Sequence, residues 1–186
     1  MNRLVVVTVG KTHSGKTTFA ANLEAQMHNA VIIDQDNHAA FINTYYKSLR
    51  PKEGPNTLKY AVTQTIVDYA ADQTDCHLIL CNSNLARKGR IDVLNYFRSK
   101  GFRSILVYLD IPHEVLQARV AGSQRSKAIF RSASTFEEVL ARQQSESHKA
   151  EMAPPAEGEA DHLFTIRTSE EVPAVIEKIA SIAGRS

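Results

Sequence analysis

The chain has 186 residues, of which 43% are hydrophobic and 23% charged, and its formal net charge at pH 7 is +2. These values are typical of a globular protein, and they give no electrostatic reason to favour or exclude nucleic acid as a partner. No apolar stretch approaches the ~20 residues of a membrane span, and the N-terminus lacks a signal-peptide pattern. We therefore expect one cytoplasmic domain over residues 1–186 with no membrane partner. No feature of the sequence predicts an oligomeric state.

Short apolar runs alternate with helical patterns along the whole chain. The runs predict buried strands at residues 3–9, 30–33, 77–81, 104–109 and 162–166. Apolar spacing and end signals predict helices at residues 16–28, 37–49, 56–71, 87–100, 112–121, 135–147 and 170–183. This order predicts an α/β fold in which helices cover both faces of a five-stranded parallel sheet.

Two of the predicted helices carry apolar residues that indicate a buried side. In residues 56–71 one stripe is formed by Leu58, Val62, Ile66 and Tyr69. In residues 37–49 the apolar residues at helical spacing are Phe41, Ile42, Tyr45 and Leu49. We expect Tyr45 to pack in the core. The two cysteines, Cys76 and Cys81, lack the spacing of a metal site, so we interpret them as reduced packing residues.

A glycine-rich segment separates the first predicted strand from the first predicted helix. It fits the pattern G-x-x-x-x-G-K-[ST] and consists of Gly10, Lys11, Thr12, His13, Ser14, Gly15, Lys16 and Thr17, with Thr18 as a second hydroxyl. Backbone N–H groups and a helix N-terminus bind phosphate in this context, so we expect the segment to bind a nucleoside triphosphate such as ATP. Lys16 would reach the β- and γ-phosphates, and the Thr17 hydroxyl would bind Mg²⁺. The alternatives are a chance glycine turn before a helix and, for His13, a plain exposed side chain.

Polar residues follow several predicted strands, at the edge of the sheet where ligands of such folds bind. Asp34 and Asp36 come just after strand 30–33. They could hold Mg²⁺ through water, and Asp36 could accept a proton from an attacking hydroxyl. The alternative is that one of the pair caps the next helix, which Asp36 could do. Asn82 and Asn84 follow strand 77–81 and belong to the same predicted edge.

The order of these segments resembles a group of P-loop kinases that contains polynucleotide 5′-hydroxyl kinases, zeta-toxin-like kinases and small-metabolite kinases for adenylyl sulfate, gluconate and shikimate. The resemblance covers about residues 3–150. It rests on the glycine-rich segment, Asp34-Gln35-Asp36-Asn37, Asn82-Ser83-Asn84-Leu85, and Leu109-Asp110-Ile111-Pro112 with the arginines that follow. It implies a three-layer P-loop NTPase fold of the nucleoside-monophosphate-kinase-like, AAA-type kind, with a lid at about residues 122–134.

The resemblance also implies roles for single residues on the acceptor side. Asp36 matches the general base of polynucleotide kinases. The stretch Ser83-Asn84-Leu85 matches a T-N-L segment of those enzymes, and basic residues follow it here, so Arg87 is expected to bind the acceptor together with Asp34, Asn82 and Asn84.

Lid arginines of this group bind the base or the phosphates of the nucleotide. Arg119 and Arg125 match them best, and Arg131 matches only loosely. Independently of any family, a mobile arginine-rich segment can exclude water and neutralise charge that develops on the γ-phosphate. Arg125 would then be catalytic together with Lys16 and Asp36. The alternative for the arginines is a solvated basic surface.

These features predict a Mg²⁺- and ATP-dependent phosphotransferase that moves the γ-phosphate to a hydroxyl acceptor, either a small metabolite, a nucleoside or a polynucleotide 5′-hydroxyl. Polynucleotide kinases have an arginine three residues after the base, where this chain has Ala39, which disfavours a nucleic-acid end. GTP stays open as the donor. The alternative from another class is a nucleotide-binding regulatory ATPase without a dedicated acceptor. Side chains that could meet an anionic acceptor are Tyr45, Tyr46, Lys47, Arg50, Lys52, Lys59 and Tyr60.

Overall fold

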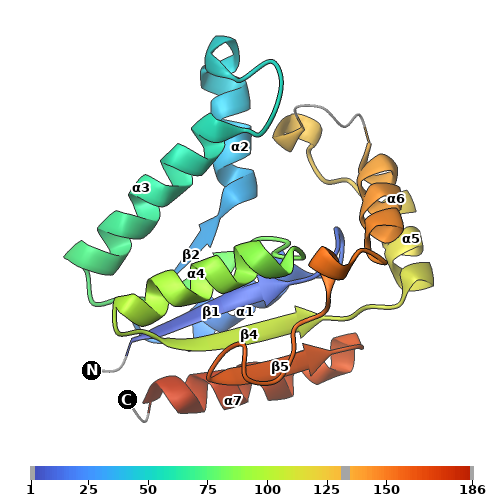
Figure 1. Cartoon of the computed structure of the whole chain (residues 1–186). Coiled ribbons are helices and arrows are strands. Elements are labelled where there is room, and N and C mark those ends of the chain that lie inside the picture. Colours follow the sequence, from blue (N-terminus) through green and yellow to red (C-terminus); the bar gives the residue numbers. More distant parts are fainter. Residues whose placement is uncertain (1–2, 131–134, 185–186) are drawn as a thin grey trace.

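The computed structural model describes residues 3–130 and 135–184, and a five-stranded sheet forms its centre. The strands are β1 (Leu4–Val9), β2 (Ala30–Asp34), β3 (His77–Cys81), β4 (Arg103–Leu109) and β5 (His162–Ile166). Neighbouring strands pair in parallel in the order β2-β3-β1-β4-β5. Figure 1 shows the sheet between its covering helices. The predicted parallel sheet is confirmed, and each strand lies within about one residue of its predicted bounds.

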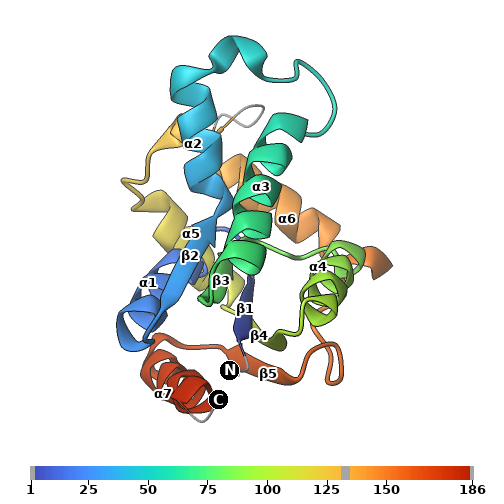
Figure 2. The ribbon, with the colours of Figure 1, turned by 90° about the vertical axis from the view of Figure 1, so that its left-hand side faces the viewer.

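Helices cover both faces of this sheet, which confirms the three predicted layers. One face carries α1 (Lys16–Gln26) and α7 (Val172–Gly184), and the other carries α3 (Thr57–Gln73) and α4 (Arg87–Ser99), as Figure 2 shows from the side. The remaining helices are α2 (Gln35–Tyr45), α5 (His113–Ala121) and α6 (Phe136–Glu146). Four short 3-10 turns are η1 (Lys47–Leu49), η2 (Lys127–Ile129), η3 (Ala150–Met152) and η4 (Ser169–Glu171).

The core lies on both sides of β1, all of whose residues are buried, as expected for a central parallel strand. Successive side chains of a strand point to opposite faces, so Leu4 and Val6 pack with α1 and α7, whereas Val5 and Val7 pack with α3 and α4. A separate small cluster joins α5 to α6 and consists of Leu116, Val120, Phe136 and Leu140. These two helices therefore have a core of their own at the edge of the sheet.

The helices α2 and α3 pack together and extend away from the sheet (Figure 1), and only part of the predicted burial of their apolar stripes is confirmed: Ile42 is buried, whereas most of the other stripe residues are exposed. Tyr45 is 71% exposed and Tyr69 is 66% exposed. The buried side of α3 is instead made of Thr63, Val67, Ala70 and Ala71. Small side chains allow α3 to approach the sheet and α2 closely, and no described element covers the outer side of this helix pair.

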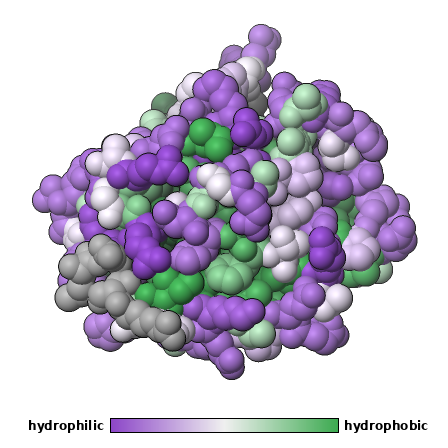
Figure 3. Space-filling model, turned by 60° about the horizontal axis from the view of Figure 1, so that its bottom comes forward, coloured by the Kyte–Doolittle hydropathy of each residue, from purple (hydrophilic) through white to green (hydrophobic). Residues whose placement is uncertain are grey.

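None of the described helices combines the length and the apolar character needed to cross a membrane. Hydrophilic side chains predominate on the face that Figure 3 shows, and hydrophobic ones gather there in a few places only.

Cys76 and Cys81 are both free thiols, as predicted.

Candidate active site

A cavity of about 1000 Å³ opens at the carboxyl edge of the sheet. It is bordered by the glycine-rich segment, the ends of β2 and β3, the first turn of α3 and the chain between α5 and α6. Lining residues that matter below are Lys16, Thr17, Asp36, Lys59, Arg119 and Arg125. The volume lies at the upper end of the ~300–1000 Å³ typical of small-molecule sites, which suits a nucleotide together with a second substrate.

The glycine-rich segment Gly10–Thr17, called the P-loop below, has the backbone of an anion site. Gly10 donates its N–H to the Ser83 carbonyl at 3.0 Å, and a Cβ at Gly10 would lie 2.7 Å from Ser14 Oγ. Gly15 has a left-handed φ of +99° and is the N-cap of α1, where no side chain accepts a helical N–H. The first N–H groups of α1 are thus left for an anion, which the positive end of the helix dipole also favours.

The ammonium group of Lys16 lies folded back on this loop. Its Nζ donates to the Gly10 carbonyl at 2.9 Å, to the Lys11 carbonyl at 2.6 Å and to Ser14 Oγ at 3.2 Å. Burial lowers the pKa of Lys16 to about 8, against the opposing effect of nearby acidic groups. A bound phosphate would favour the charged form and raise this pKa again, so Lys16 suits an anionic ligand.

Asp34, rather than Asp36, caps α2. The helix begins at Gln35 directly after β2, two residues before its predicted start, and the Asp34 carboxylate accepts the Asp36 N–H at 2.8 Å. Asp34 is buried beside Cys81, and burial raises the pKa of its carboxyl group. The carboxylate of Asp36, in the first turn of α2, is therefore not engaged in capping and lines the cavity.

Arg125 reaches Asp36 from the lid segment, as we call the described residues 122–130. Its Nη2 lies 2.8 Å from Asp36 Oδ2, and its guanidinium lies 5.5 Å from the ring of Phe136. Arg119, on α5, donates to the P-loop carbonyl of His13 at 3.2 Å and to Ser169 Oγ at 3.1 Å. The structure thus brings both predicted lid arginines to the cavity, whereas Arg131 and the rest of the predicted lid, residues 131–134, lie outside the described residues.

The helix α6 also holds the P-loop, through residues that the sequence did not indicate. Gln143 Oε1 accepts the Thr12 N–H at 2.7 Å, and Gln144 Oε1 accepts from Lys11 Nζ at 2.6 Å. His13 is half-buried instead of exposed: its Nε2 lies 2.8 Å from Ser123 Oγ, and its ring contacts Phe136 at 4.7 Å between centroids. A pair of glutamines on an amphipathic helix has no distinctive spacing, so no pattern could have revealed these contacts.

The remaining predicted residues divide between the cavity and its surroundings. Thr17, Thr18 and Asn82 line the cavity, and Thr17 Oγ1 lies 3.7 Å from Cys81 Sγ. Asn84 turns away, with a φ of +45°, and donates its side-chain amide to the Thr8 carbonyl at 2.9 Å. Arg87 pairs with Glu159 at 3.3 Å. Asn84 and Arg87 are therefore not brought to the cavity with Asp36.

Comparison with known proteins places this arrangement in a family. A family model described as an AAA domain matches residues 5–149. No curated protein sequence matches the chain.

Several solved structures share the fold at low sequence identity. A sugar kinase from a Janibacter species, solved without ligand, is 20% identical with a TM-score of 0.60 over 97% of this chain and 94% of its own. The APS kinase CysC of Mycobacterium tuberculosis, in complex with AMPPNP and APS, is 17% identical with a TM-score of 0.59 over 96% of this chain and 98% of its own. Kti12 of Chaetomium thermophilum, in complex with ADP-AlF3, is 15% identical with a TM-score of 0.63 over 95% and 97%. Because the family match covers well over half of the chain, the protein belongs to this AAA-domain family, and its fold is the three-layer α/β fold of P-loop kinases.

Proposed function

We propose that the protein is a Mg²⁺- and ATP-dependent phosphotransferase that transfers the γ-phosphate to a hydroxyl group of a small metabolite, a nucleoside or a polynucleotide 5′ end. The observation that carries the proposal is that the P-loop and the Asp36 carboxylate open into one cavity, with Arg125 within 2.8 Å of that carboxylate. A protein that only binds nucleotide needs no carboxylate and arginine facing its phosphate site.

The donor half of the site consists of the P-loop and the start of α1. The N–H groups that follow Gly15 and the ammonium group of Lys16 would hold the β- and γ-phosphates, and Arg119 lies against the same loop. The described residues contain no cluster of three or more metal-binding side chains, which fits Mg²⁺ because this ion binds mainly to phosphates, water and one or two protein oxygens. Thr17 supplies such an oxygen. Bound there, Mg²⁺ would neutralise phosphate charge.

The acceptor half faces Asp36. The oxygen of the acceptor hydroxyl forms a bond to the γ-phosphorus, the bond from that phosphorus to the β–γ bridging oxygen breaks, and ADP leaves. Asp36 takes the proton of the attacking hydroxyl as general base. Arg125 and Lys16 stabilise the charge that spreads over the transferring group. Arg125 lies beside Asp36 and lines the same cavity as the P-loop.

A panel assay tests this proposal: transfer of labelled γ-phosphate to metabolites, nucleosides and 5′-hydroxyl oligonucleotides by the wild type and by Lys16→Ala, Asp36→Asn and Asp110→Asn. Asp110→Asn is the matched control, because its carboxylate also follows a strand but pairs with Arg167 at 3.5 Å outside the cavity. We expect Lys16→Ala to lose about 3–4 kcal/mol of transition-state stabilisation. Asp36→Asn should keep ATP binding and lose about 10²- to 10⁴-fold in turnover.

Other outcomes would count against the proposal. Near-normal transfer by Lys16→Ala would overturn it, and equal loss of ATP binding and turnover in Asp36→Asn would assign Asp36 to metal binding or to structure. ATP turnover that stays the same across the whole panel would favour the regulatory ATPase.

A further inference from the structure

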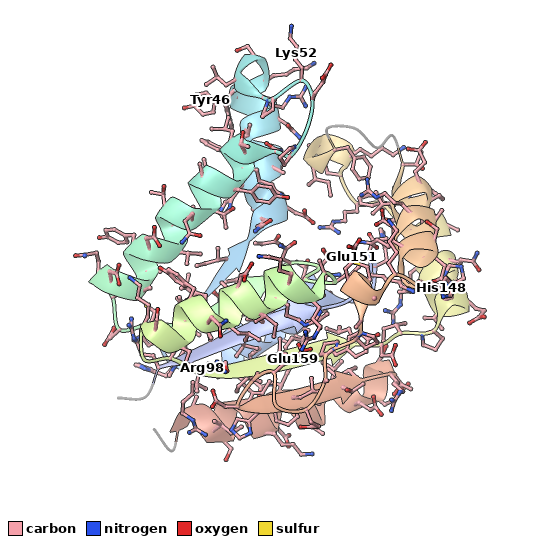
Figure 4. All side chains as sticks on the ribbon, viewed as in Figure 1. Tyr46, Lys52, Arg98, His148, Glu151 and Glu159 are labelled. Carbon is pink, nitrogen blue, oxygen red and sulfur yellow. The ribbon has the colours of Figure 1, made fainter. Side chains whose placement is uncertain are left out.

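One cation of the cavity has no role in the mechanism above. Lys59 lies in the first turn of α3, lines the cavity and is half-buried. Of the basic and aromatic residues that the sequence offers for an anionic acceptor, only Lys59 and Tyr60 line the cavity. Tyr46 and Lys52 lie at the outer end of the α2–α3 pair, away from the sheet, as Figure 4 shows.

The ammonium group of Lys59 has no polar partner among residues 3–130 and 135–184. Within the described residues it donates no hydrogen bond and has no carboxylate within 4 Å, and its nitrogen lies 4.8 Å from the centroid of the Tyr60 ring. Burial lowers the pKa of Lys59, although Asp36 and Asp34 oppose this effect. A half-buried cation without a counter-ion is unfavourable, and the fold has placed it where a ligand enters.

Within the described residues, the other charged groups that line the cavity have partners, Arg142 excepted. Asp34 caps α2, and Asp36 pairs with Arg125. Lys16 is bound by the carbonyl groups of the P-loop, and Arg119 by the His13 carbonyl and Ser169. Arg142 also lines the cavity but is exposed, so its charge is solvated. A counter-ion for Lys59 therefore has to come from a ligand rather than from the described part of the chain.

We propose that Lys59 binds an anionic group of the acceptor, a phosphate, sulfate or carboxylate, while the hydroxyl group of the same molecule faces Asp36. The inference rests on the proposed phosphotransferase function and restricts its acceptor to an anionic hydroxyl compound. Lys59 and Asp36 line the same cavity, and the Asp36 carboxylate is the first of the charges that oppose the effect of burial on the pKa of Lys59.

The lid segment completes this subsite with apolar surface. Asn43 of α2 donates its side-chain amide to the carbonyl groups of Ala128 at 2.6 Å and Phe130 at 3.2 Å. This contact fixes the end of the lid segment next to α2, where Ile129 and Phe130 line the cavity. An acceptor with a charged end and a small apolar body would contact Lys59 with the first and these side chains with the second.

The first experiment compares acceptors in matched pairs: hydroxyl compounds with and without an anionic group, such as a nucleoside and its 3′-monophosphate, a sugar and its phosphate, and an alcohol and the corresponding hydroxy acid. The wild type, Lys59→Met, Lys59→Arg and the control Lys52→Met are assayed on each. We expect the anionic member of a pair to be preferred, and Lys59→Met to raise its KM about 10- to 100-fold with little effect on the neutral member. Lys59→Arg should restore part of the affinity, and Lys52→Met should behave as wild type.

A second experiment does not need an acceptor. Inorganic sulfate is titrated into protein saturated with Mg-AMPPNP, so that the P-loop is occupied, and binding is followed by calorimetry. Sulfate should bind to the wild type and bind about 10-fold or more weakly to Lys59→Met. Equal sulfate binding by both proteins would overturn the inference. So would an equal loss of phosphoryl transfer to neutral and to anionic acceptors in Lys59→Met.

The two experiments distinguish a failure of the proposed anion subsite at Lys59 from a failure of the proposed phosphotransferase function. Transfer to neutral acceptors without any dependence on Lys59 overturns the inference and keeps the phosphotransferase. If sulfate binding depends on Lys59 but no member of the panel is phosphorylated, the anion subsite is supported and the phosphotransferase function is refuted.

Discussion

The guanidinium group of Arg125 lies 2.8 Å from the carboxylate of Asp36, and this ion pair joins the lid segment to the start of α2. The two side chains are 35% and 42% exposed, so water screens their attraction. A triphosphate on the P-loop would offer Arg125 a partner of higher negative charge. We expect Arg125 to move toward it, which would free Asp36 to accept a proton.

We predict that Arg125→Gln lowers activity and leaves the stability of the fold nearly unchanged. Turnover should fall about 10²- to 10³-fold, because a donor that meets transition-state charge is lost. The free energy of unfolding should change by less than about 1 kcal/mol, as for other exposed ion pairs. Steady-state kinetics and urea denaturation measure the two effects, and Lys127→Gln, an exposed lysine of the same segment that does not line the cavity, is the control. Unchanged turnover would remove Arg125 from the mechanism.

The same substitution at two glycines should have opposite effects on stability. Gly15→Ala places an alanine at a φ of +99°, which costs about 1–2 kcal/mol, although the new Cβ meets only ordinary contacts at 3.8 Å and 3.9 Å. Its strain lies in the loop that offers N–H groups to phosphate, so ATP affinity should fall as well. Gly89, inside α4, has nothing within 4 Å of a Cβ, and Gly89→Ala should stabilise the fold by about 0.5–1 kcal/mol. Equal stability of the two variants would contradict this account.

The sheet and the position of the P-loop at its edge could be predicted from the sequence because both depend on local patterns. Five apolar runs mark the strands, and the P-loop pattern includes its own strand and helix. Burial of Tyr45 could not be predicted in this way, because helical spacing identifies an apolar stripe but not whether another element covers it. Likewise, the contact of Gln143 with the Thr12 N–H and the approach of Arg125 to Asp36 join segments far apart in the chain, and they follow only from the packing of α5 and α6 beside the sheet.

A buried ion pair between α4 and the loop before β5 was not predicted from the sequence either. Arg90 is completely buried in α4, and its Nε lies 2.8 Å from Oε2 of Glu159, a residue in the loop that precedes β5 and is labelled in Figure 4. Removing the anion leaves a buried unpaired cation, so Glu159→Ala should destabilise the fold by about 3–5 kcal/mol. Arg87 pairs with the same carboxylate but is 56% exposed, so Arg87→Ala should cost less than about 1 kcal/mol. Urea denaturation of both variants measures the difference, and similar losses would contradict the assignment.

The Arg90–Glu159 pair also predicts how stability depends on pH. Burial alone would raise the pKa of Glu159, but the hydrogen bond and charge of Arg90, with smaller effects of the Ala156 segment and Arg87, lower it below its usual 4.5. A carboxyl group with a depressed pKa in the folded state stabilises the fold above its unfolded pKa, and this contribution is lost as the pH falls through its folded pKa. The difference in unfolding free energy between the wild type and Glu159→Gln should therefore be constant near neutral pH and shrink below pH 4.5. A difference that grows toward acid pH would contradict the predicted sign.

The last prediction is that the Thr17 hydroxyl binds Mg²⁺. Its hydroxyl has a single weak partner in the described structure, Cys81 Sγ at 3.7 Å, so it is free to bind Mg²⁺. Thr17→Ala should raise the Mg²⁺ concentration needed for half-maximal phosphoryl transfer about tenfold or more, and removal of Mg²⁺ by a chelator should abolish transfer in all variants. Thr17→Ser keeps the hydroxyl and should behave nearly as wild type. Thr18→Ala tests the neighbouring hydroxyl, which also lines the cavity. If Thr18→Ala shifts the Mg²⁺ requirement and Thr17→Ala does not, the metal ligand is Thr18, because only the side chain that binds the ion can change its affinity directly.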